Sequence, residues 1–104
     1  MNASMNSSKR MPIAKLVPPH ADKHWSFQVA NREPAHEQAV RVCMASADVK
    51  AAKPFLQGCS VDWLMVEFWT HDIDDVARAA NALAESVGLP LQHGNFTRGE
   101  LGLD

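Results

Sequence analysis

The sequence predicts a small α+β domain, a two-layer sandwich in which two helices cover one face of a mainly antiparallel sheet. Three segments lead to this class. Residues 24–30 alternate apolar and polar side chains, residues 61–70 are apolar on both alternating faces, and residues 72–87 repeat apolar side chains at helical spacing. The 104 residues, 46% of them hydrophobic, are enough for one domain with a real core.

Residues 24–30 form the first predicted core strand. Trp25, Phe27 and Val29 share one face of it, which is typical of a strand with that face buried.

Residues 34–57 have two interpretations. In the first, Pro34 takes the first turn of one long helix that stops before Pro54. Its apolar stripe would comprise His36, Val40, Cys43, Met44, Ala47 and Ala51. In the second, a strand over Gln38–Ala45 precedes a short helix over Asp48–Gln57. The Ala-rich composition favours the long helix.

The strongest helix prediction covers residues 72–87. Asp72, Asp74 and Asp75 lie in its first turn, where carboxylates cap free N–H groups and complement the helix dipole. Gly88 follows as the expected C-terminal residue. The apolar stripe consists of Ile73, Val76, Ala77, Ala80, Leu83, Ala84 and Val87.

The domain is expected to cover residues 20–93, with a short last strand near 89–92. Residues 1–19, rich in Ser, Asn and Pro, are expected to form a flexible arm, in which Ile13–Val17 could add a short edge strand. Residues 94–104, with three glycines, are expected to form a flexible tail. The order of strands and helices is analogous to a ferredoxin-like arrangement, an analogy of fold that says nothing of function.

The stretch 61–70 carries the main functional hypothesis. Leu64, Val66 and Phe68 occupy one face of this strand and serve the core. The other face carries Trp63, Met65, Glu67 and Trp69. Two helices cover only one face of the sheet, so the second face needs other cover, and large exposed apolar patches are typical of binding surfaces.

We therefore predict a small protein-binding or regulatory module. Its partner is a second copy of the chain, giving a homodimer, or a different protein. Trp63, Met65 and Trp69 would anchor the partner, and Glu67 would set specificity. The competing interpretation is that the chain's own ends fold over this face. The available apolar side chains are Met5, Met11, Ile13, Leu16, Phe96, Leu101 and Leu103.

Glu67 is the polar exception in its strand. A carboxyl group among tryptophans can serve as a general acid or base. More often such a group pairs with an arginine, here Arg41 or Arg78.

Metal binding is a weaker hypothesis. His71, Asp72 and Asp74 lie where the strand leads into the helix, so a metal-dependent hydrolase or nuclease-type enzyme is the alternative function. Helix capping already explains these acids. His20 and His24, spaced by four, could bind zinc, but no further ligand stands at diagnostic spacing.

Charge bears on nucleic-acid binding, and sequence motifs bear on catalysis. The formal net charge is −2, which argues against a domain that binds nucleic acid through its phosphates. Residues 1–25 carry a local +3, so a basic N-terminal arm with Lys9, Arg10, Lys15 and Lys23 is a third route, to nucleic acid. No nucleotide or catalytic motif is present, so we predict no cofactor and no catalytic residue.

Cellular location follows from three absences. No run approaches the ~18 apolar residues of a membrane span, and no apolar segment near the first residue indicates a secretory signal. Cys43 and Cys59 are too few for a disulfide framework and are expected to be small buried residues. The sequence predicts a cytoplasmic protein that does not engage a membrane.

Overall fold

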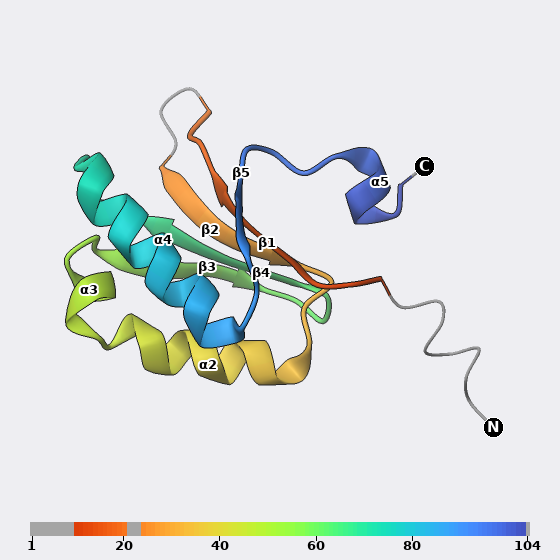
Figure 1. Ribbon diagram of the computed structural model, residues 1–104, viewed down its shortest axis with the longest axis horizontal. Coiled ribbons are helices and arrows are strands. Elements are labelled where there is room, and N and C mark those ends of the chain that lie inside the picture. The colour runs from red at the N-terminus through yellow and green to blue at the C-terminus, as the bar shows by residue number, and fades with distance from the viewer. Residues whose placement is uncertain (1–9, 21–23, 104) are drawn as a thin grey trace.

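A computed structural model describes residues 10–20 and 24–103 and confirms the α+β sandwich (Figure 1). The described residues form one five-stranded mixed sheet in the order β3-β4-β2-β1-β5. Its strands are β1 (Ile13–Val17), β2 (Trp25–Ala30), β3 (Pro54–Cys59), β4 (Trp63–Phe68) and β5 (Leu91–His93). Its helices are α2 (Pro34–Met44), α3 (Ala47–Lys50), α4 (Ile73–Val87) and α5 (Arg98–Leu101). All neighbouring strands are antiparallel except β1 and β5, which are parallel.

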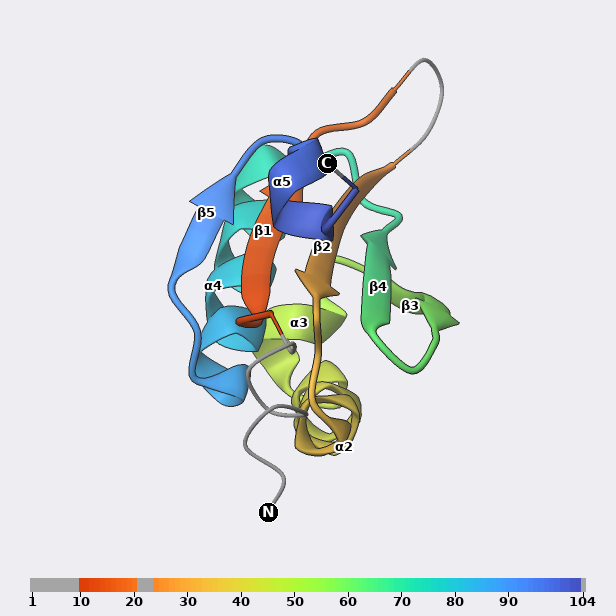
Figure 2. The ribbon, with the colours of Figure 1, turned by 90° about the vertical axis from the view of Figure 1, so that its right-hand side faces the viewer.

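The helices lie on both sides of the sheet. Figure 2 shows α3 and α4 behind the strands, α2 below them, and α5 in front of β1 and β2. Within the described residues, no helix is long and apolar enough to cross a membrane.

The hydrophobic core fills the space between the sheet and the layer of α2, α3 and α4. Its sheet side is the predicted face of β2 and β4, fully buried at Phe27, Val29, Leu64, Val66 and Phe68. Its helix side consists of Val40, Val49, Ala52, Val76, Ala79, Ala80, Leu83 and Ala84.

Helix α4 confirms the strongest sequence prediction. The Asp72 carboxylate accepts hydrogen bonds from the backbone N–H groups of Asp74 and Asp75 at 2.9 and 3.2 Å. Gly88 ends the helix with φ of 73°, a left-handed conformation that glycine adopts without strain.

The structure decides between the two interpretations of residues 34–57. The helix prediction is correct for α2, with Pro34 in the first turn, and the strand over Gln38–Ala45 was wrong. However, the helix ends near Ala45 and restarts as α3 in a new direction. As a result Val49 and Ala52 are buried, while Ala47 and Ala51 of the expected stripe are exposed.

Strand β3 was missed by both interpretations. Lys53 has φ of 54°, and the chain reverses there to run as an edge strand beside β4. A bulge between Leu56 and Gly58 interrupts the pairing, and the outward half of the strand is solvated. The outward positions hold both the apolar Phe55 and the polar Gln57, so apolar and polar side chains do not alternate clearly in this part of the sequence.

The folded domain extends beyond the expected residues 20–93 at both ends of the sequence. Ile13–Val17, placed in the arm or at an edge, is an interior strand between β2 and β5, because Ala14 and Leu16 pack into the core. Within the expected tail, Thr97 and Glu100 form a reciprocal capping box that starts α5. That Thr-x-x-Glu signature was present in the sequence. Residues 1–9, the rest of the predicted arm, lie outside the described residues.

Candidate functional site

Helix α5 and the segment before it divide the second face of the sheet into a covered half and an open half. On the covered half, the Phe96 ring packs on Trp63, with 5.2 Å between ring centroids. Ala30 lies directly across from Trp63 in β2. The chain's own C-terminal segment therefore covers Trp63, as the competing interpretation expected.

Lys15 in β1 links the C-terminal segment to the sheet. Its buried ammonium group donates to Glu100 Oε1 at 2.8 Å and to the Asn95 carbonyl at 3.1 Å. It also lies 5.1 Å from the centroid of the Phe96 ring. The hydrogen bond from Lys15 holds the pKa of Glu100 below its usual range, helped by the Thr97 backbone N–H. Lys15 is thus committed within the fold and is not part of a basic arm.

The open half contains a cavity of about 260 Å³, here called the sheet-face cavity. Its floor is the outer face of β2 and β4, and its side wall is the end of β1 and the chain that follows. The polar lining residues are His20, His24, Ser26, Gln28, Gln57 and Glu67. The apolar lining residues are Val17, Pro18 and Met65.

Glu67 stands at the centre of this arrangement. In the sheet register it lies directly across from Ser26 in β2 and from Phe55 in β3. The two arginines expected to pair with it are engaged elsewhere, Arg41 with Glu37 at 3.0 Å and Arg78 with Asp75 at 2.9 Å. Among the described residues, no Lys or Arg lines the cavity.

Local contacts hold the cavity lining in place. Gln28 and Ser26 are both buried, and the Gln28 side-chain amide donates a hydrogen bond to the Ser26 hydroxyl at 2.9 Å. The His20 ring is 3.2 Å from the Asn95 side-chain oxygen, and the His24 ring stacks on Trp69 with 4.6 Å between centroids.

Beside the cavity lies a second feature, here called the aromatic surface: Lys53, Pro54, Phe55 and Trp69. These residues line a shallow, mainly apolar hollow of about 440 Å³. The side chains of Phe55 and Trp69 are 51% and 52% exposed. Their rings pack edge to face, with 6.2 Å between the ring centroids. The Trp69 backbone N–H donates to the carbonyls of Ala52 and Lys53 at 3.1 and 3.0 Å, which fixes both sides of the hollow.

The four predicted partner-binding residues therefore lie in three different regions of the surface. Trp63 is covered, Met65 and Glu67 line the sheet-face cavity, and Trp69 belongs to the aromatic surface. Sequence reasoning missed Phe55, because its strand was not recognised.

The predicted metal candidates do not come together. In the part of the chain that the structure describes, no group of three or more His, Cys, Asp or Glu side chains is placed to hold a metal ion. Asp72 caps α4, and His71 and Asp74 are exposed. His20 follows β1 and His24 precedes β2, neither lies in a helix, and both line one cavity.

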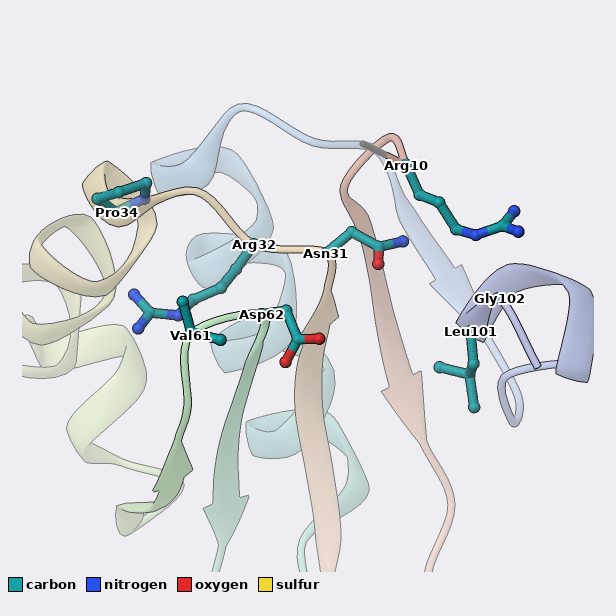
Figure 3. Close-up of a pocket in the computed structure, with 8 residues that line it drawn as sticks. All are labelled: Arg10, Asn31, Arg32, Pro34, Val61, Asp62, Leu101 and Gly102. Carbon is teal, nitrogen blue, oxygen red and sulfur yellow. The ribbon is translucent and has the colours of Figure 1, made fainter. Parts of the chain in front are cut away.

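A third hollow, of about 540 Å³, lies at the far end of the sheet (Figure 3). Its polar side chains already tie loops together. Arg32 donates to the Ser60 carbonyl at 2.7 Å, Asn31 to the Glu100 carbonyl at 3.3 Å, and Arg10 to the Gly99 carbonyl at 3.3 Å. This hollow is consistent with a structural junction.

Both cysteines are free thiols. Cys43 is half-buried, but Cys59 is exposed, contrary to the expectation of burial. Partial burial and a hydrogen bond to the Glu37 carboxylate raise the pKa of the Cys59 thiol. A raised thiol pKa lowers the thiolate population and argues against a nucleophilic role.

Comparison of the chain with protein families, with characterised proteins and with solved structures finds no match in any of the three. The functional argument therefore rests on the geometry of the open half of the sheet.

Proposed function

We propose that this protein is a small cytoplasmic protein-binding module that forms a homodimer through its aromatic surface. The observation that carries the proposal is the pair Phe55 and Trp69, two large aromatic side chains half exposed and in contact with each other. Interface cores are enriched in aromatic residues, and symmetric two-fold dimers are the commonest oligomers.

The position of this surface favours approach by a partner. β3 is an edge strand, so no neighbouring strand obstructs access to Phe55. Pro54 has no backbone N–H, and the bulge after Leu56 interrupts the regular ladder, so backbone pairing with another strand is disfavoured. Side-chain packing is the better mode of association.

The chemistry of the surface is self-complementary. Lys53 lines the same hollow as the two aromatic rings. In a two-fold arrangement, the ammonium group of one copy can lie over the Trp69 ring of the other, a cation–π contact. A surface that offers both the cation and the ring fits a second copy of itself.

The expected contribution of Trp69 follows from its exposure. A buried tryptophan removes up to about 250 Å² from water, and 52% of this side chain is still exposed. Burial of roughly 100 Å² at about 25 cal/mol per Å² gives ~2.5 kcal/mol per copy. This value lies in the range of interface hot spots.

Light scattering over a concentration series tests the proposal. The wild-type chain is expected to be a dimer that dissociates on dilution, and Trp69→Ala and Phe55→Ala are expected to be monomers at the same concentrations. Val42→Ala removes an exposed apolar side chain from the helix layer and should leave the dimer intact. A wild-type chain that is monomeric throughout, or a dimer unaffected by both aromatic substitutions, would refute the proposal.

A further inference from the structure

We infer that the sheet-face cavity binds a guanidinium group, at a site distinct from the proposed dimer contact. The inference combines the charge of the cavity, its hydrogen-bonding groups and its size.

The charge of the lining calls for a cation. Glu67 is the acidic side chain that lines the cavity, and no described Lys or Arg shares the lining with it. Lys15 lies on the same face of the sheet, across from Gln28, but its ammonium group is paired with Glu100. A carboxylate in a recess that meets no cation among the described residues gains most from a positively charged ligand.

The hydrogen-bonding groups favour a planar cation over a spherical one. A guanidinium carries five N–H donors in a fixed plane and can bind a carboxylate through two parallel hydrogen bonds. Glu67 supplies the carboxylate, Ser26 lies directly across from it, and Gln28 and Gln57 add side-chain amides to the same lining. A hard metal ion needs several charged oxygen ligands, whereas this lining offers one carboxylate.

The apolar and aromatic parts of the wall also suit this group. Guanidinium planes are weakly hydrated and pack on flat or apolar surfaces. Met65 and Pro18 provide apolar contact. The stack on Trp69 holds the His24 ring in one orientation at the cavity wall.

The volume limits the size of the ligand. Drug-sized ligands occupy pockets of about 300–1,000 Å³, and this cavity measures about 260 Å³. The space therefore fits a head group of side-chain size. The ligand is either a free guanidinium metabolite or an arginine side chain presented on a peptide. Both present the same guanidinium group to the cavity.

Amide chemical shifts of the 15N-labelled full chain provide the test. N-acetyl-arginine amide is expected to cause saturable shifts at Ser26, Gln28 and Glu67. The matched neutral probe, N-acetyl-citrulline amide, has nearly the same shape and should cause none. A blocked Ala-Arg-Ala tripeptide forms the second arm. Binding of both arginine probes indicates an arginine within a chain, and binding of the blocked amino acid alone indicates a free ligand.

Substitutions complete the test. Glu67→Gln keeps the shape of the side chain and should weaken arginine binding by about tenfold or more, the factor that matches loss of one charge-assisted hydrogen bond. Glu85→Gln, on the exposed side of α4, should leave binding unchanged. Equal binding by Glu67→Gln, equal binding of citrulline, or no saturable shift with either arginine probe would overturn the inference. The proposed homodimer would stand in each of those cases, because its test is solution mass.

Discussion

Phe96 provides the most direct test of how the second sheet face is covered. In Phe96→Ala the ring that packs on Trp63 and lies beside the Lys15 ammonium is lost. Water then reaches a tryptophan and a buried cation that the ring had shielded. We expect a clear loss of stability from this single substitution.

The magnitude follows from the contacts of the ring. Removal of a fully buried phenylalanine costs about 3–5 kcal/mol, and Phe96 is only partly buried, so about half of that is expected. The aromatic pair accounts for ~0.5–1.5 kcal/mol of it and the cation–π contact for ~0.5–1 kcal/mol. A loss of ~2 kcal/mol in a domain of this size lowers Tm by about 10 °C.

Urea and thermal unfolding followed by circular dichroism would measure the change. Leu103→Ala is the matched control, because it removes an exposed apolar side chain from the same C-terminal segment and should change stability little. Tryptophan fluorescence should shift to longer wavelength in Phe96→Ala before any unfolding begins. Unchanged stability and unchanged fluorescence would contradict the cover that we describe.

Two further predictions concern single side chains. Asp72→Ala removes the cap of α4 and should lower the free energy of unfolding by about 1 kcal/mol, measured in urea, whereas an unchanged midpoint would mean that the cap does not contribute. Acid should weaken the Lys15–Glu100 contact. The folded-state pKa of Glu100 lies below its unfolded value, so its stabilisation is present above the unfolded pKa and is lost as the pH falls through the folded pKa. Glu100→Gln should therefore be less stable than wild type at pH 7 and differ little from it in acid. An equal difference at both pH values would argue against this role for the carboxylate.

The sequence predicted the elements whose signals are local. Helix α4 has both a cap and a long apolar stripe, β2 shows clear alternation, and β4 is a continuous apolar run, so local patterns were enough. Strand β3 shows no clear alternation of apolar and polar side chains, and it is defined by pairing with β4 across a bulge. The interior position of β1 depends on β5, which lies far away in the sequence.

The candidate site shows the same limit. Glu67 and Trp69 stood out because a charged group and a large ring interrupt or extend an apolar strand. The sequence could not place Phe55 beside them, because its position across from Glu67 depends on the register between β3 and β4. The sheet-face cavity combines side chains of four strands, β1 to β4, with residues of the chain between β1 and β2, so no single stretch of sequence contains its pattern.

The contact between Lys15 and Glu100 also has a consequence for the order in which parts of the protein fold during synthesis. Lys15 can meet Glu100 only when nearly the whole described chain has left the ribosome, because 85 positions separate them. Until then its ammonium group remains hydrated on the face of β1, where a charge discourages unwanted strand pairing. Contacts between positions so far apart in sequence form slowly. The covered half of the sheet should therefore be the last part of the molecule to close.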